Sequence, residues 1–206
     1  MELDSAALVT SAEQLAALYA APSERARLKQ IDHIDPNCRA FIEASPFFAL
    51  STCGLSGADC SPRGDAEGSI IVADEHTLLI ADRRGNNRLD SLRNILDNPS
   101  VGMLFLIPGL NETLRVNGRA QISRDPGLLA RFGVTGKLPV TVLAIRVDEA
   151  YIHCGRALVR AGLWESRTQP PAVPSIGTML AAHTQGKVDA QVYDEQVAAH
   201  LHQTLY

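Results

Sequence analysis

Short apolar segments separated by turn residues fill the middle of the chain, and this pattern constrains the fold more than any other feature. Within residues 113–123, Leu114, Val116 and Ala120 alternate with polar neighbours, as in a strand with one buried face. Residues 101–107 instead form a nearly continuous apolar run, which is typical of a strand buried on both faces. Further strands are expected over 47–52, 70–73, 77–81 and 140–147, the last reaching 151–152.

These expected strands are joined by short turns, and only two helical segments, 87–97 and 126–132, interrupt them. A doubly wound parallel sheet would instead need a helix after nearly every strand. The pattern therefore predicts a mainly β protein with helical additions (α+β), built on a six-stranded antiparallel barrel.

The ends of the chain carry helix signals. N-cap residues are expected at Ser11, at Asp35 ahead of a proline, and at Asp189. Shorter helices are expected over 24–31 and 156–164, and a proline-rich linker precedes the last helix. The sequence thus predicts a helical extension over 1–45, a barrel over 46–165, and a linker with a helical tail over 166–206.

Composition narrows the classes of partner. The net charge of −4 and pI near 5.8 argue against nucleic acid, whose binding needs many Lys and Arg contacts to phosphates. The N-terminus lacks a basic segment followed by an apolar one, and no apolar run approaches membrane-spanning length. The four cysteines show no CxxC and no zinc-like pairing, so we expect no metal site. These features predict a cytoplasmic protein that binds neither membrane nor nucleic acid.

A cluster of arginines stands out in this acidic chain. Arg83, Arg84 and Arg88 surround a glycine where a strand ends, and Asn87 is expected to cap the following amphipathic helix. The first turn of a helix offers free N–H groups to an anion, and arginines add charge-assisted bonds to phosphate. The alternative is a solvated loop whose arginines pair with nearby aspartates. The pattern alone leaves both interpretations open.

A second basic residue, Arg63, lies in the Ser-Pro-Arg-Gly-Asp segment at 61–65, which is expected to be a bend before a strand. From such a bend Arg63 would approach the same anion as the arginines of 83–88. A simple surface turn is the alternative.

Together these segments resemble the FMN-binding split-barrel superfamily, which includes pyridoxamine 5′-phosphate oxidase and its relatives. The resemblance runs from about residue 46 to 164. Its motifs are Phe-Ala-Leu-Ser-Thr at 48–52, Ser-Pro-Arg-Gly-Asp at 61–65, Asp-Arg-Arg-Gly-Asn-Asn-Arg at 82–88, Asn-Pro-Ser-Val-Gly-Met-Leu-Phe at 98–105 and Glu-Thr-Leu-Arg-Val-Asn-Gly-Arg-Ala at 112–120. It implies a split barrel of the FMN-binding type, flavin mononucleotide (FMN) as cofactor, and a homodimer with the flavin at its interface.

The resemblance also implies roles for individual residues. Arg63 matches the family's first phosphate-binding arginine, and Arg88 and Ser91 match its other phosphate contacts, with Arg83 and Asn87 as additional donors. This turn departs from the shorter Ser-Arg-Lys pattern of the true oxidases, so the assignment within 83–91 stays open. Thr113 stands where a polar side chain meets the flavin ring. Trp164 either covers the flavin from the partner subunit or fills a core or interface position.

The resemblance predicts an FMN-dependent oxidoreductase that acts on a small-molecule substrate, which the sequence does not identify. The flavin supplies the redox chemistry, so no catalytic acid or base is named. His153 and Cys154 are neighbours on a strand and point to opposite faces, which favours structural roles. The alternatives are a flavin-binding or redox-sensing protein without turnover, and a split barrel that holds a deazaflavin or haem.

Overall fold

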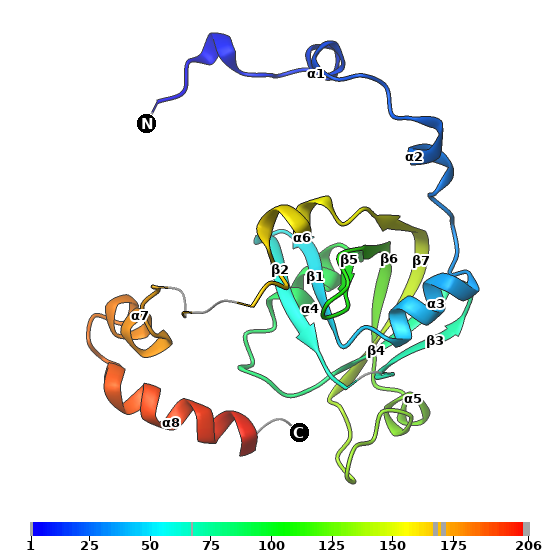
Figure 1. Cartoon of the computed structure of the whole chain (residues 1–206). Coiled ribbons are helices and arrows are strands. Elements are labelled where there is room, and N and C mark those ends of the chain that lie inside the picture. The colour runs from blue at the N-terminus through cyan, green and yellow to red at the C-terminus, as the bar shows by residue number, and fades with distance from the viewer. Residues whose placement is uncertain (1, 67, 167–168, 170–171, 204–206) are drawn as a thin grey trace.

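The computed structural model describes residues 2–66, 68–166, 169 and 172–203. Its centre is one antiparallel sheet of seven strands in the order β2-β1-β5-β6-β7-β4-β3 (Figure 1). No strand pairing joins the edge strands β2 and β3 among the described residues, so the barrel is open between them. The strands are β1 (Phe47–Gly54), β2 (Gly57–Gly64), β3 (Ile70–Asp74), β4 (Thr77–Asp82), β5 (Ser100–Leu106), β6 (Thr113–Ser123) and β7 (Thr141–His153).

The predicted strand count of six is wrong because β2 is a strand and not a bend. It pairs with β1 along its whole length, from Phe47 opposite Gly64 to Gly54 opposite Gly57. A proline such as Pro62 usually argues against a strand. An edge strand tolerates it, because one side of its backbone needs no hydrogen-bond partner. Arg63 therefore belongs to a regular strand.

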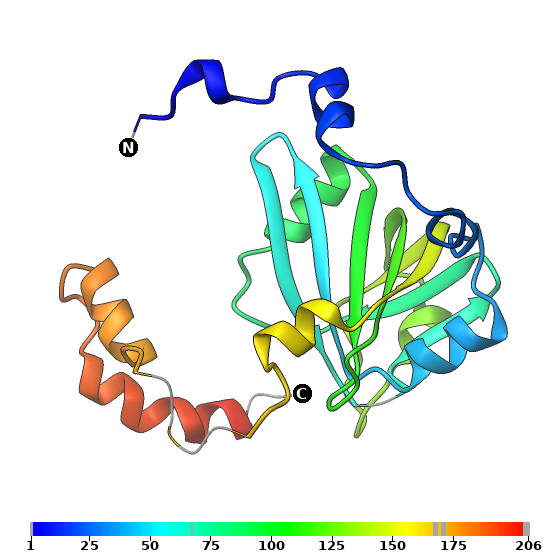
Figure 2. The same ribbon diagram turned by 45° about the horizontal axis from the view of Figure 1, so that its top comes forward.

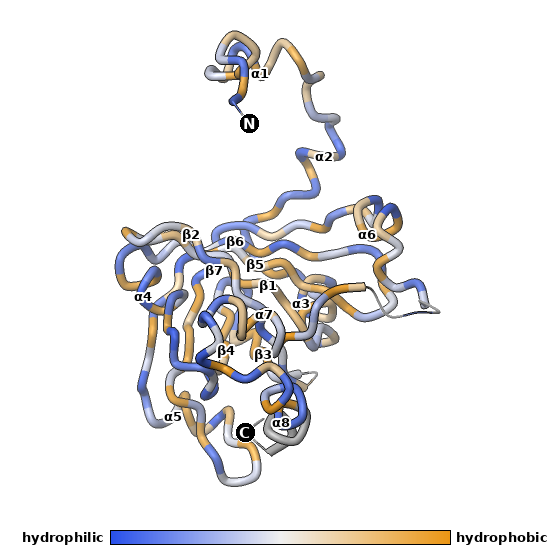
Figure 3. Tube along the Cα trace, turned by 90° about the vertical axis from the view of Figure 1, so that its left-hand side faces the viewer, coloured by the Kyte–Doolittle hydropathy of each residue, from blue (hydrophilic) through white to orange (hydrophobic). Residues whose placement is uncertain are grey.

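The core lies on the concave face of the sheet. Leu50, Phe105, Leu114 and Val116 have no exposed surface. Helix α3 (Pro36–Glu43), which the sequence placed in the N-terminal extension, covers one side of this core with the fully buried Ile42. In Figure 3 the hydrophobic colour is concentrated along the strands of the sheet.

Strand β5 was expected to be buried on both faces, and in the single chain this is wrong. Val101, Met103 and Phe105 are buried, but the alternate residues Leu104 and Leu106 are only half-buried. The convex face of the sheet is thus left partly open along β5.

Helix α4 (Asp90–Asp97) packs against β1 and β2. Asn94 is buried, and its Nδ2 donates to Thr52 Oγ1 and to the Gly57 carbonyl, both at 3.1 Å. A Cβ on Gly54 would lie 2.6 Å from Asn94 Oδ1, so only glycine allows this close approach. These contacts fix the helix over the polar end of the β1–β2 hairpin.

The expected Asn cap of this helix is wrong. Residue Asn87 has a φ of 58°, in the left-handed region, whereas N-cap residues adopt extended angles. The N-cap is Leu89, also left-handed at φ 59°, and no side chain caps the first turn. The chain makes an irregular turn before the helix, in which Asn86 Oδ1 accepts from the Arg88 N–H.

The ends of the chain extend away from the sheet (Figures 1 and 2). The expected caps at Ser11, Asp35 and Asp189 are confirmed, because each side chain accepts a hydrogen bond from an N–H three residues further on. The N-terminal segment joins the barrel through paired backbone hydrogen bonds between Ile31 and Ala150. The remaining helices are η1 (Ser5–Ala7), α1 (Ala12–Leu18), α2 (Glu24–Leu28), α5 (Pro126–Ala130), α6 (Arg156–Ala161), α7 (Ile176–His183) and α8 (Ala190–Gln203).

Helix α7 was not predicted, and it packs against α8 as a separate pair. Within the part of the chain that the structure describes, no helix combines the length and apolar character needed to cross a bilayer.

Candidate functional site

A row of polar residues lies on the core-side face of β2. Asp59, Ser61 and Arg63 stand opposite the buried residues Thr52, Leu50 and Phe48 of β1. Residues directly opposite each other on paired strands project to the same face, so this row continues the core surface with polar groups. All three residues are half-buried, and α4 packs over them.

Ser91, in the first turn of α4, connects the helix to this row. Its Oγ donates to Asp59 Oδ2 at 2.6 Å, and Ser61 Oγ donates to the same oxygen at 2.8 Å. The two hydroxyl oxygens lie 3.2 Å apart. The hydrogen bond from Ser91 has the largest effect on the pKa of Asp59 and lowers it. Burial, the next largest effect, opposes this, but the hydrogen bond from Ser61 and the charges of Arg63 and Arg88 help to hold the pKa below its usual range. Asp59 is therefore a carboxylate at neutral pH.

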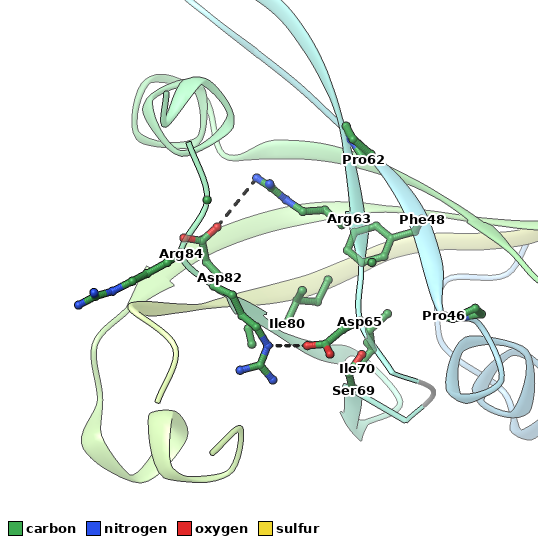
Figure 4. A pocket seen from close by; sticks show the side chains of 14 residues that line it. Pro46, Phe48, Pro62, Arg63, Asp65, Ser69, Ile70, Ile80, Asp82 and Arg84 are labelled. Carbon is green, nitrogen blue, oxygen red and sulfur yellow. Dashed lines mark hydrogen bonds and ion pairs between the residues drawn. The ribbon is translucent and has the colours of Figure 1, made fainter. Parts of the chain in front are cut away.

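Two ion pairs link the end of β2 to the end of β4 (Figure 4). Arg63 lies 3.9 Å from Asp82, and Arg83 Nε donates to Asp65 Oδ2 at 2.5 Å. Arg84 turns away from both pairs. Burial raises the pKa of Asp82, and the nearby Arg63 offsets only part of this effect.

Two adjoining cavities, of about 650 and 500 Å³, open around these pairs, and both are lined by Arg63, Asp82 and Arg83. Their volumes fall within the ~300–1,000 Å³ typical of small-molecule sites. The larger cavity also meets Ser91 and Thr141. The Thr141 hydroxyl is buried without a hydrogen-bond partner among the described residues, so it is available to a polar ligand atom.

The larger cavity brings together most of the predicted site residues. Arg63, Arg83, Asn87, Arg88 and Ser91 all line it. Their environments differ, because the Arg88 side chain is 77% exposed and its Nε donates to Asp90, whereas Ser91 is buried. The arginines of this turn line a cavity, and two of them pair with aspartates, Arg83 with Asp65 and Arg88 with Asp90.

Thr113 and Trp164 lie apart from this cavity. Arg63 shares a cross-strand row with Phe48, Phe105 and Leu114, whereas Thr113 lies in the neighbouring row, opposite His153. Adjacent rows project to opposite faces of a sheet. Trp164 donates from Nε1 to the Leu110 carbonyl, in the β5–β6 loop. Within one chain, the structure therefore does not join these two residues to the arginine cluster.

Sequence reasoning missed Asp59, Ser61, Asp82 and Thr141 as cavity residues. The alternation of Asp59, Ser61 and Arg63 was a usable signal for a strand with one polar face, but a proline and the lack of large apolar residues concealed it. No group of three or more His, Cys, Asp or Glu side chains is arranged to hold a metal in the described ranges.

Comparison with known families gives a match over residues 34–154, more than half of the chain, to the pyridoxamine 5′-phosphate oxidase family model. The chain belongs to this family. The matched segment begins just before α3 and ends just after β7, so it covers the whole sheet and every residue that lines the two cavities. The family membership confirms the resemblance on which the split-barrel expectation was based.

Several solved structures are similar to this chain. HupZ of Group A Streptococcus is 17% identical, with 57% of this chain and 91% of that chain covered and a TM-score of 0.47. General Stress Protein 26 of Bacillus anthracis is 19% identical (55% and 88% covered, TM-score 0.42). An FMN-binding protein of Syntrophomonas wolfei is 15% identical (56% and 83% covered, TM-score 0.44). A search of curated proteins finds no match.

Proposed function

We propose that this protein binds FMN through its phosphate and is an FMN-dependent oxidoreductase acting on a small-molecule substrate. The observation that carries the proposal is the meeting of Arg63, Ser91 and the first turn of α4 around one cavity in a chain of this family. A buried dianion needs several donors, and this cavity offers guanidinium, hydroxyl and backbone N–H groups.

The residues present fit a phosphorylated ligand. No side chain caps the first turn of α4, so its N–H groups stay available to an anion. The orphaned Thr141 hydroxyl adds a buried polar atom without a partner in the described structure. Arg63 is half-buried and reaches Asp82 only at 3.9 Å, which leaves room for a closer, bidentate contact to phosphate oxygens.

In such a protein the flavin supplies the hydride or electron chemistry, and the chain supplies binding, orientation and exclusion of water. Arg63 and Ser91 would hold the phosphate, while Arg83, already fixed by Asp65, would shape the rim of the cavity. The apolar Ile70 and Ile80 line the adjoining cavity and offer a surface for the ligand's less polar part. The substrate's identity does not follow from these groups.

We further propose that the functional unit is a homodimer with the flavin at its interface. The convex face of β1, β5 and β6 exposes Phe47 and leaves Leu104 and Leu106 half-buried. Thr113, next to Leu114 of the arginine row, projects to this face and is buried within one chain. A second copy packed here would cover the apolar side chains, and we propose that Thr113 and Trp164 meet the flavin in that dimer. Two-fold pairing is the commonest oligomeric solution.

The test is the cofactor content and its dependence on Arg63. We expect the purified protein to show the two absorbance bands of oxidised flavin, with FMN identified by mass spectrometry after denaturation. Arg63→Ala should weaken FMN binding about tenfold to a hundredfold while riboflavin binding changes little, because a charged hydrogen bond is worth roughly 1.5–3 kcal/mol. Arg119→Ala, on the exposed side of β6, is the matched control.

Equal losses for FMN and riboflavin would show that Arg63 does not hold the phosphate. A colourless protein that takes up no added FMN would refute the proposal. A haem Soret band or a released deazaflavin would move the assignment to those cofactors. A flavin that binds but is never reduced by candidate electron donors would favour a flavin carrier or redox sensor.

A further inference from the structure

Asp59 occupies the position that an anionic ligand would take among the donors of the larger cavity. Its Oδ2 accepts from both Ser91 and Ser61, the hydroxyl groups nearest to the start of α4. The Arg63 and Arg88 charges act on the same carboxylate. The two serine hydroxyls among the donors that would hold a ligand phosphate are thus already engaged by a carboxylate of the chain itself.

The charges around the cavity are balanced before any ligand arrives. Arg63, Arg83, Arg84 and Arg88 line it together with Asp59, Asp82 and Asp90, and Arg83 is paired in addition with Asp65. A phosphate dianion added to this set would face carboxylates at short range. Binding is then an exchange in which the donors pass from a carboxylate to the phosphate.

The Asp59 side chain has a second polar environment within reach if a ligand takes the hydroxyl groups that donate to it. It also lines a third cavity, of about 310 Å³, on the side of α4 where Arg88 and Arg93 lie. A rotation of the Asp59 side chain toward these arginines would free Ser61 and Ser91 without leaving the carboxylate in an apolar environment. Both end states then satisfy the carboxylate.

We propose that Asp59 is an internal competitor for the phosphate: it holds Ser61 and Ser91 until a ligand phosphate displaces it, and so determines how tightly the site binds a phosphorylated ligand. The inference rests on the proposed FMN site and deepens it. Asp59 is a specificity-determining residue in this scheme, because its repulsion acts on a phosphorylated ligand and spares an uncharged one.

The experiment compares Asp59→Asn with the unchanged protein, using FMN, riboflavin and inorganic phosphate as separate probes in fluorescence and calorimetric titrations. The amide keeps one acceptor oxygen for the serine hydroxyls and removes the charge. We expect FMN and inorganic phosphate to bind about tenfold more tightly, because like charges a few ångströms apart repel strongly at a protein surface. Riboflavin affinity should change by less than about twofold.

Asp148→Asn is the matched control, since it removes one carboxylate from an exposed position of β7 that lines none of these cavities. An equal gain in this control would reduce the effect to net charge and overturn the proposal, as would unchanged or weaker phosphate binding by Asp59→Asn. Asp59→Ala should show the same gain and guards against a folding artefact of the amide. If neither flavin binds to any variant, the FMN proposal fails, and inorganic phosphate alone still decides the role of Asp59.

Discussion

Asn94 ties α4 to the β1–β2 hairpin, and its removal should weaken both the fold and the phosphate site. Its amide donates to Thr52 Oγ1 and to the Gly57 carbonyl. Each hydrogen bond contributes about 1 kcal/mol, so Asn94→Ala loses about 2 kcal/mol. Alanine's better helix propensity returns roughly 0.5 kcal/mol. The expected net loss in the free energy of unfolding is about 1.5 kcal/mol.

Urea unfolding measures this loss. With a slope of about 2 kcal/mol per molar urea, the midpoint should fall by about 0.75 M at an unchanged slope. Asn37→Ala is the control, because Asn37 is an exposed helical residue whose amide donates to the nearby Asp35. A midpoint shift for Asn94→Ala no larger than that of the control would refute the assigned role of the amide.

The same variant tests how the site is built. Ser91 lies one helical turn before Asn94, so a loosened α4 should misplace its hydroxyl and first-turn N–H groups. FMN affinity should fall together with stability, and riboflavin affinity should fall less. Full FMN affinity at a temperature where Asn94→Ala remains folded would show that α4 does not position the phosphate donors.

Two further predictions concern charge and assembly. Burial raises the pKa of Asp82 in the folded state, so its ionisation costs stability as pH rises from its unfolded-state pKa, near 3.9, through its folded-state pKa. Asp82→Asn should therefore gain stability relative to the wild-type protein as pH rises from 3 to 7, measured by urea titration. A stability difference that does not change with pH would contradict this sign. Leu104→Glu puts a charge on the half-buried convex face, so sedimentation should show a dimeric wild-type protein and a monomeric variant. A wild-type protein that is already monomeric would contradict the dimer proposal.

The strands were predictable wherever an apolar face marked them. Residues 113–123 were found to the residue, because their alternation reflects burial on one side of the sheet. Strand β2 was missed because its core-side face carries Asp59, Ser61 and Arg63. A hydrophobic period cannot mark a strand whose inward residues are polar, and this strand lines the candidate site.

Some helix boundaries were likewise predictable from the sequence, and others were not. The caps at Ser11, Asp35 and Asp189 depend on groups three residues apart, and the sequence contains that information. The start of α4 depends instead on where β1 and β2 hold Asn94 and Ser91. Asn87 has the right chemistry for a cap, but this packing places it in a left-handed turn outside the helix.

The pairing of arginines with carboxylates shows why the candidate site was predictable only in part. The sequence offered an anion site or a solvated loop whose arginines pair with aspartates. Arg88 and Asp90 are near neighbours and their exposed pair was foreseeable, whereas Arg83 pairs with Asp65 only because β2 and β4 end at the same place in space. Exposed pairs contribute little, so a phosphate can recruit Arg88 at small cost. The half-buried carboxylates Asp59 and Asp82 would instead have to move or protonate if a dianion entered, so we expect them to set its affinity.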